Sequence, residues 1–217
     1  KMRKKLLLSF MLVCISIFAF GALSVSAYNG TQYGDTPLYY EVSNSEVTIT
    51  DCSNSAKPIE IPATIDRKPV TSIGAHAFSD CTKLTSITIP DSVTSIGDYA
   101  FVCCESLTSI TIPNNITSIG VRAFQQCKSL TSITIPDSVT SIGDFAFIWC
   151  KVLTSINVDI NNGYFSSFDG ALYSKDKTKL IRYAPGKTIK SFEIPDDVKT
   201  IDNGAFSDCN NLTSIII

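Results

Sequence analysis

The sequence is short of the side chains on which acid–base and nucleophilic catalysis depend. It has one histidine, His76, and no Ser or Cys nucleophile stands at a motif spacing from it. Neither a G-x-S-x-G nor an H-E-x-x-H motif occurs in the 217 residues. We therefore expect no enzyme active site, and we interpret His76 as a surface residue on the outer side of one repeat.

Basic residues are also scarce. The segment Lys1–Ala27 holds four of the 18 Lys and Arg and none of the 20 Asp and Glu, so the rest of the chain has a net charge of -6. Proteins that bind nucleic acid need a basic stripe facing the phosphates. We expect no nucleic-acid partner. No column of histidines or carboxylates accompanies the cysteines, and we expect no metal and no cofactor.

Long apolar runs are absent after Ala27. Lys1–Lys5 is basic, residues 6–23 are mostly apolar and Ser24–Ala27 has small residues. This order predicts a secretory signal peptide over residues 1–27, cleaved after Ala27. The alternative is an uncleaved membrane anchor, because about 18 apolar residues nearly span a bilayer. Either way we expect a secreted or cell-surface protein that meets the membrane only through this segment or a missing anchor.

The chain is built on a 23-residue repeat. LTSITIPDSVTSIGDYAF at 84–101 returns at 130–147 with a single change, Tyr99 to Phe145. The leucines, prolines, phenylalanines and cysteines of the repeat keep the same step: Leu84, Leu107, Leu130, Leu153; Pro90, Pro113, Pro136; Phe78, Phe101, Phe124, Phe147; Cys81, Cys104, Cys127, Cys150. A fixed period in the twenties is typical of a solenoid.

Each repeat predicts one circuit of the chain, called a coil below. Ile110 and Ile112 alternate with polar residues, which predicts a strand with one face inward, and Pro113 ends that strand. Gly120 is expected to permit a turn, after which a short helical turn places the Phe124 ring in the core. The predicted fold is a leucine-rich-repeat solenoid of mostly short parallel β-strands with short helical turns on the other side.

The repeat is interrupted in two places, which suggests the domain organisation. Residues 28–55 are predicted to form an N-terminal cap with a β-hairpin, and 56–217 about six coils plus a truncated last one. The coil at 153–188 holds 13 extra residues, in which 171–174 and 179–183 predict a second hairpin. The last repeat stops before its proline, so we expect further repeats or an attachment module.

The residues of the repeat resemble those of the BspA-like leucine-rich repeat proteins. Their pattern L-x-x-I-x-I-P-x-x-V-x-x-I-G-x-x-A-F-x-x-C is matched almost throughout by Leu107–Cys127, and the resemblance covers nearly all of residues 38–217. It implies a secreted or surface-displayed bacterial protein that contacts host matrix proteins, mucosal surfaces or other cells, without catalytic residues. Asp202 departs from the pattern because it stands in the glycine column, which puts that turn in doubt.

The cysteines form a column in the repeat. Buried free thiols behave as small hydrophobic side chains, but neighbouring coils would also bring Cα atoms within reach of a disulfide. Both states stay open. The Asp159–Gly163 segment with Asp169 resembles a calcium loop, yet its glycine falls at position 5 and position 12 is Gly170, so we predict a turn.

The outward strand positions are the candidates for partner binding. Eight of them form two polar columns: Ser86, Thr88, Ser109, Thr111, Ser132, Thr134, Ser155 and Asn157. They predict either a docking strip for an extracellular protein or glycan, or a face that is merely kept soluble. Five aromatic residues of the 153–188 coil are a second candidate, and at least half of them are expected in the core: Tyr164, Phe165, Phe168, Tyr173 and Tyr183. The alternative function is a structural spacer that displays another domain.

Overall fold

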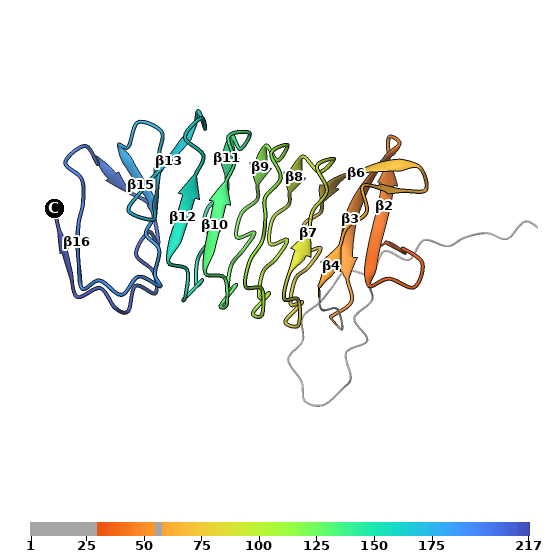
Figure 1. Ribbon diagram of the computed structural model, residues 1–217, viewed down its shortest axis with the longest axis horizontal. Helices are drawn as coiled ribbons and strands as arrows, with labels where there is room; N and C mark the ends of the chain where they lie inside the picture. The colour runs from red at the N-terminus through yellow and green to blue at the C-terminus, as the bar shows by residue number, and fades with distance from the viewer. Residues whose placement is uncertain (1–29, 55–57) are drawn as a thin grey trace, which may run out of the picture.

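The computed structural model describes residues 30–54 and 58–217, which form one elongated stack of coils (Figure 1). Strands of successive coils lie side by side along the stack, with the N-terminal strands at one end and the C-terminus at the other. The predicted leucine-rich-repeat solenoid is confirmed. The predicted signal peptide lies outside the described residues, and within the described ranges no helix is long and apolar enough to cross a membrane.

One side of the stack is a continuous sheet that starts antiparallel and continues parallel. The hairpin predicted near the N-terminus is present as β2 and β3, and β3 then pairs in parallel with β6. Beyond β6, short strands follow at the repeat period, in the order β6-β8-β9-β11. The strands on this side are β1 (Thr31–Gln32), β2 (Leu38–Ser43), β3 (Glu46–Cys52), β6 (Lys68–Ile73), β8 (Ser95–Ile96), β9 (Ser118–Ile119) and β11 (Ser141–Ile142); β5 (Thr64–Ile65) pairs with β6.

The second side carries the strands of the S-I-T-I segments. They pair in parallel as β4 with β7, β10 with β12 and β16 with β18. The bounds are β4 (Ile59–Glu60), β7 (Ile87–Thr88), β10 (Ser132–Ile135), β12 (Ser155–Val158), β16 (Ser191–Glu193) and β18 (Ser214–Ile216). The prediction of a strand around Ile110 and Ile112 is wrong, because residues 107–113 form no strand. Both isoleucines are nevertheless buried, as expected.

The third side of each coil consists of overlapping β-turns, so the predicted short helical turns are wrong. In the coil at 74–81, alternate N–H groups donate to the carbonyl three residues earlier. The N–H groups between them, of His76, Phe78 and Asp80, donate instead to carbonyls of the next coil at 2.7–2.9 Å. His76 and Asp80 have left-handed φ angles of 61° and 57°, which a right-handed helix excludes.

These left-handed residues recur in two columns along the stack. The first, called the His76 column, contains His76, Tyr99, Arg122 and Phe145; the second, called the Asp80 column, contains Asp80, Cys103, Gln126, Trp149 and Asp208. Because L-residues rarely adopt this conformation alone, the hydrogen bonds between coils are what hold it.

The glycine of each repeat permits close approach of coils rather than a special turn angle. Gly120 does not have a positive φ, contrary to our expectation of its role. A Cβ placed on it would lie 2.4 Å from the carbonyl carbon of Gly97. Glycine is needed there because the backbones of successive coils touch.

The core is a set of stacked columns. The rings of Phe78, Phe101, Phe124 and Phe147 lie parallel, with successive centroids 5.0, 5.2 and 5.7 Å apart. The leucine column and the inward isoleucines are buried beside them in one continuous cluster. Burying each such side chain stabilises the fold by about 1.5–3 kcal/mol, which compensates for the many Ser and Thr residues outside.

The coil at 153–188 contains the predicted hairpin and one further strand. β13 (Phe165–Phe168), β14 (Ala171–Ser174) and β15 (Lys179–Arg182) are antiparallel, and β15 pairs in parallel with β17 (Thr200–Ile201). The strand β13 was not predicted. A second, smaller core cluster begins within this hairpin coil and continues into the last coil, with Tyr183 packed against Phe192.

Arg182 repairs the hydrogen bonding between the hairpin coil and the last coil. Pro185 lies one repeat before Asp208 and therefore occupies the Asp80 column, where it has no N–H to give to the next coil. The Arg182 guanidinium, 5% exposed, donates instead to the carbonyls of Ser207 at 3.1 Å and Gly204 at 2.5 Å. A buried charge thus replaces a missing backbone donor.

Asp202 is accommodated in the glycine column, so the turn we doubted is formed. Its N–H donates to the carbonyl of Leu180 at 2.9 Å, just as Gly97 donates to Ile73 at 2.8 Å. Its carboxylate pairs with Lys179 at 2.8 Å. A cavity of about 40 Å³ beside Phe145 and Asp202 marks the looser contact between coils here.

Candidate functional site

The eight predicted partner-binding residues lie on the outside of the second side of the stack, the side of the S-I-T-I segments. We call their surface the strand face: Ser86, Thr88, Ser109, Thr111, Ser132, Thr134, Ser155 and Asn157. Six of the eight are exposed and Ser86 and Ser155 are half-buried. Thr88 lies in β7, Ser132 and Thr134 in β10, and Ser155 and Asn157 in β12, and Figure 1 shows β10 beside β12 with β7 further along the same side.

Strand register places the two polar columns in line. Ser132 lies opposite Ser155 and Thr134 opposite Asn157 in the parallel pair of β10 and β12. At the other end, Glu60 of β4 lies opposite Thr88 and extends the threonine column. Neighbouring strands are about 4.8 Å apart, so the hydroxyls recur at that spacing.

The structure separates two kinds of threonine that the sequence does not distinguish. Thr94, Thr117 and Thr140 each donate a side-chain hydrogen bond to the carbonyl of the threonine 23 residues earlier, at 3.1–3.2 Å. Thr108 and Thr154 do the same beside the strand face, at 3.3 and 3.0 Å. These hydroxyls are used in joining coils.

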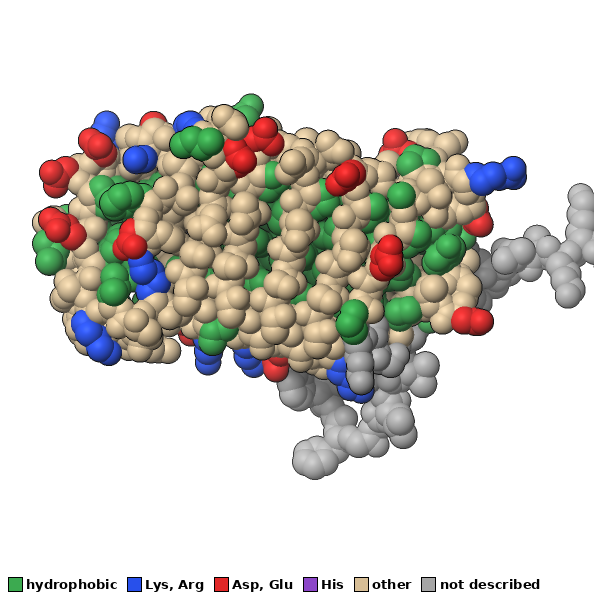
Figure 2. All heavy atoms as spheres, viewed as in Figure 1, with side chains coloured by type: hydrophobic (Ala, Val, Ile, Leu, Met, Phe, Trp, Pro, Cys, Tyr) green, Lys and Arg blue, Asp and Glu red, His purple; other side chains and the backbone are tan. Residues whose placement is uncertain are grey.

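The hydroxyls of the strand face are free by comparison. Within the described part of the chain, the side chains of Thr88, Ser109, Thr111, Ser132 and Thr134 make no hydrogen bond. Asn157 and Ser155 bond each other at 3.4 Å. No charged residue occurs in the four segments 85–89, 108–112, 131–135 and 154–158. Figure 2 shows this face as a broad area with few charged side chains.

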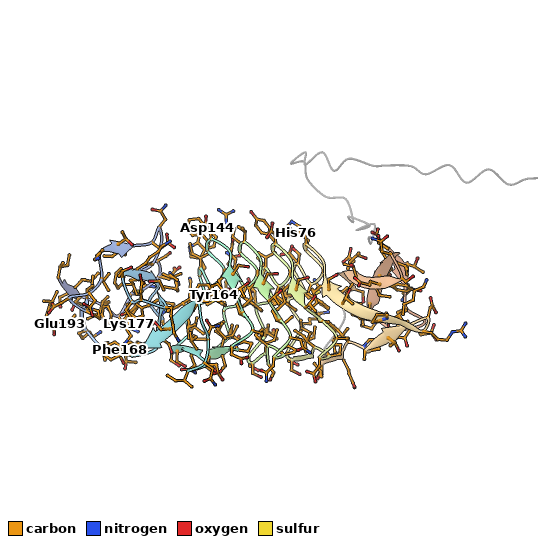
Figure 3. All side chains as sticks on the ribbon, turned by 90° about the horizontal axis from the view of Figure 1, so that it is seen from above. His76, Asp144, Tyr164, Phe168, Lys177 and Glu193 are labelled. Atoms are coloured by element: carbon orange, nitrogen blue, oxygen red, sulfur yellow. The ribbon has the colours of Figure 1, made fainter. Side chains whose placement is uncertain are left out.

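The hairpin coil borders the strand face beyond β12. The carbonyl of Gly170 accepts a hydrogen bond from the N–H of Ile156 at 2.9 Å, so the turn between β13 and β14 adjoins β12. Phe168, the last residue of β13 beside this turn, is 54% exposed, with the Lys177 ammonium 5.8 Å from its ring centroid. Figure 3 shows both residues near one long edge of the molecule, opposite the edge that carries His76 and Asp144.

The five aromatic residues of the hairpin coil divide between core and surface. Tyr173 and Tyr183 are fully buried, and burial raises the pKa of each phenol to about 12. Phe165 packs against the main core. Only Tyr164 and Phe168, at 57% and 54% exposure, can serve as surface anchors.

His76 belongs to a stacked row of side chains that was not predicted from the sequence. Its ring lies parallel to that of Tyr99, with centroids 4.8 Å apart. The Arg122 guanidinium follows, 5.7 Å from the Tyr99 ring and 5.5 Å from that of Phe145. The 23-residue spacing of these four residues was the available signal. The four side chains therefore form a continuous stack along the outside of the turns.

The cysteine column is a row of buried thiols that donate hydrogen bonds along the stack. Cys104, Cys127 and Cys150 donate to the carbonyls of the phenylalanines 26 residues earlier, at 3.1–3.3 Å. All seven described cysteines are free thiols. The column thus fills space and satisfies carbonyl groups, as predicted for buried thiols.

The segment with the calcium-like spacing is a turn centred on a buried asparagine. The Asn162 amide donates to the carbonyls of Pro136 and Val139 at 2.7 and 2.9 Å, and its oxygen accepts from two backbone N–H groups. The Lys175 ammonium binds the carbonyls of Ile160 and Asn162. In residues 30–54 and 58–217, no group of three or more His, Cys, Asp or Glu is placed to hold a metal ion.

A comparison with protein families identifies the repeat. The model of the family described as BspA type Leucine rich repeat region matches six copies in residues 47–172 and 183–217. No curated protein shows significant similarity to the chain.

Solved structures of bacterial leucine-rich repeat proteins are similar to this one. A protein from Eubacterium ventriosum has a TM-score of 0.60 and 27% identity over 88% of this chain, which spans 59% of that protein. One from Bacteroides capillosus has a TM-score of 0.52 and 35% identity over 57% of this chain and 94% of its own. The pneumococcal vaccine antigen PcpA has a TM-score of 0.50 and 25% identity over 78% of this chain and 60% of its own.

Proposed function

Because this chain belongs to the BspA-type leucine-rich repeat family, we propose that it is a non-catalytic binding module of the bacterial cell exterior. Its ligand is an extracellular protein or glycan, bound on the strand face. The likeness to PcpA, described as a vaccine antigen, supports a location outside the cell. An apolar start of the chain with the features of a signal peptide supports the same location.

The observation that carries the proposal is the set of unused hydroxyls on the strand face. Hydroxyls of Thr108 and Thr154 are occupied between coils, whereas those of Ser109 and Thr111 are not. A row of free donors and acceptors on a rigid sheet recognises a ligand at low cost in conformational entropy. Because the face has no charge between β7 and β12, binding should change little between low and high salt.

Replacement of two hydroxyls by large cations tests the proposal. Wild-type protein is first tested on an array of matrix proteins and glycans to find the ligand that it binds. The double variant Ser109→Arg with Ser132→Arg should no longer bind that ligand. Ser118→Arg with Ser141→Arg, on the other sheet, is the matched control and should bind like wild type. Equal binding by both double variants would contradict the proposal.

The second candidate function is a spacer that presents another part of a longer protein. It is favoured by one comparison, in which this chain spans 59% of the length of the E. ventriosum protein. A spacer predicts that residues 28–217 bind nothing on the array while a longer native protein does.

A further inference from the structure

A polar hollow lies on the turn side of the stack, away from the strand face. It measures about 260 Å³ and is lined by Gln126, Lys128, Trp149, Lys151 and Asp208. Trp149 and Asp208 belong to the Asp80 column, with Pro185 between them in the repeat. Pro185 is buried, so residues two coils apart line the same space.

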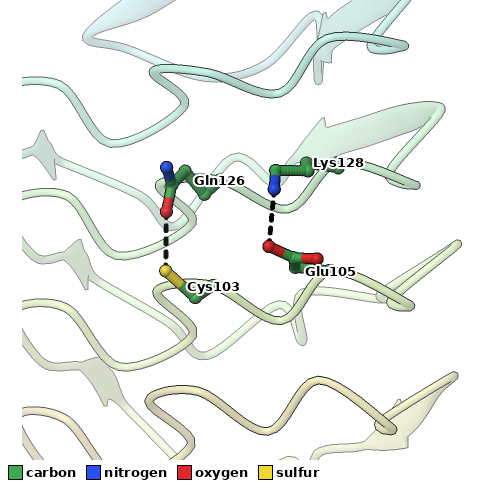
Figure 4. A network of polar contacts seen from close by, with 4 residues as sticks. All are labelled: Cys103, Glu105, Gln126 and Lys128. Carbon is green, nitrogen blue, oxygen red and sulfur yellow. Dashed lines mark hydrogen bonds and ion pairs between the residues drawn. The ribbon is translucent and has the colours of Figure 1, made fainter. Parts of the chain in front are cut away.

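The hollow offers an aromatic surface and several unused polar groups. Trp149 is 39% exposed, and its indole N–H has no hydrogen-bond partner among the described residues. The oxygen of the Gln126 amide accepts from the Cys103 thiol at 2.7 Å, which leaves its NH2 group available (Figure 4). One carboxylate oxygen of Asp208 accepts a hydrogen bond from the Ser207 hydroxyl at 3.2 Å, which leaves the other oxygen available as an acceptor.

The two lysines differ in their charge balance. Lys128 is paired with Glu105 at 2.6 Å, as Figure 4 shows. Lys151 is exposed and, among the described residues, has no carboxylate partner. The hollow therefore carries one unpaired cation beside an aromatic ring, an amide donor and a carboxylate acceptor.

We propose that this Trp149 hollow binds a pyranose ring that carries a carboxylate. The apolar face of the sugar would lie on the indole, and its carboxylate would meet the Lys151 ammonium. Gln126 and Asp208 would bond the ring hydroxyls, as donor and acceptor. The volume is below the roughly 300–1,000 Å³ of pockets for drug-sized ligands, which fits one or two sugar units.

The charges of the molecule favour a single sugar acid over a long polyanion. Glu105 and Asp208 flank the hollow, and residues 28–217 have a net charge of -6. A highly charged chain would meet repulsion beyond the one cation that Lys151 offers. Sialic acids and uronic acids share the required chemistry, so the probes must separate them.

Trp149 is the only tryptophan in the sequence, so its fluorescence reports directly on the hollow. Titration with 3′-sialyllactose or a glucuronic-acid disaccharide should change the emission with saturation in about the millimolar range, whereas lactose should bind about tenfold more weakly. The stronger of the two acid probes identifies the class of acid. Lys151→Gln should reduce affinity for the acid probe about tenfold and leave lactose unchanged, and Lys83→Gln is the matched control.

Calorimetry on Trp149→Ala, with its circular dichroism spectrum checked against wild type, should show loss of binding. Absence of saturation with both acids, equal affinity for lactose, or an unchanged affinity in Lys151→Gln would overturn the proposal. Salt-sensitive binding of heparin without binding of the short acids would also overturn it. Ser109→Arg with Ser132→Arg should leave this titration intact, so the hollow and the strand face can fail independently.

Discussion

The guanidinium of Arg182 donates to the carbonyl oxygen of Ser207 at 3.1 Å, at the point where Pro185 supplies no N–H. In the regular coils the corresponding bonds are made by the backbone, for example from Cys103 to the carbonyl of Gln125 at 2.8 Å. The hairpin coil thus keeps its place in the stack through a side chain. Desolvation lowers the pKa of Arg182, because burial disfavours the charged form of the guanidinium.

Removal of the Arg182 guanidinium should therefore loosen the last coil. Arg182→Met keeps much of the side-chain volume but leaves the carbonyls of Gly204 and Ser207 without these donors. We expect a loss of about 2–3 kcal/mol in the free energy of unfolding, measured by urea denaturation. Arg67→Met, at an exposed turn, should stay within about 0.5 kcal/mol. An equal effect of both changes would contradict this role of Arg182.

The phenylalanine column should respond strongly to truncation. Phe124 is fully buried between the rings of Phe101 and Phe147. Phe124→Ala leaves a void between two rings that cannot close, and should cost about 3–5 kcal/mol of unfolding free energy. Tyr164→Ala, at an exposed aromatic, is the control. A loss below about 1 kcal/mol for Phe124→Ala would refute the stacked core.

The glycine column gives a test of how closely the coils approach. Gly120→Ala would place a methyl group 2.4 Å from the backbone of Gly97, so the coils must separate. We expect a loss of about 1–3 kcal/mol, read from thermal or urea unfolding. Gly163 has no atom within 4 Å of an added Cβ and does not have a positive φ. Gly163→Ala should therefore be neutral or slightly stabilising. Similar losses of unfolding free energy for Gly120→Ala and Gly163→Ala would contradict the explanation that glycine permits close approach of the coils.

The periodic part of the fold was predictable because identical residues at one spacing must occupy one column. This reasoning places Phe78 to Phe147 in the core and Ser109 and Thr111 outside from the spacing alone. The conformation of the turns was not predictable in the same way. An Ala-Phe pair suits a helical turn as well as a β-turn, and only hydrogen bonds to the next coil decide between them.

The interruptions of the repeat held signals of a different kind. Pro185 stands one repeat before Asp208, so the sequence shows that it falls in the Asp80 column, but only the structure shows that this column donates N–H groups to the next coil. That Arg182 would replace the missing N–H depends on how the hairpin folds, which the spacing does not determine. The Trp149 hollow has the same origin, since it joins residues two coils apart. Non-local packing is what sequence periodicity leaves out.

Buried thiols should make the stability of the protein fall in alkaline solution. Burial raises the pKa of the Cys104 and Cys127 thiols well above the ordinary thiol range. Above about pH 8.5 the unfolded chain releases these protons while the folded chain keeps them, so the folded state binds more protons. The stability that the two thiols contribute is complete below that pH and is lost as pH rises toward their folded pKa values.

The expected slope is about 1.4 kcal/mol per pH unit for each thiol, or about 2.8 kcal/mol per pH unit for both. Urea unfolding between pH 7 and 10 in the presence of a reductant would measure it. Cys104→Ala with Cys127→Ala should be less stable at pH 7 but should have a shallower slope above pH 9, because it lacks two groups that ionise only on unfolding. Tyr173 and Tyr183, whose pKa values are raised to about 12, ionise on unfolding in both proteins and cancel in the comparison. Parallel slopes would mean that these cysteines are not protonated, buried thiols in solution.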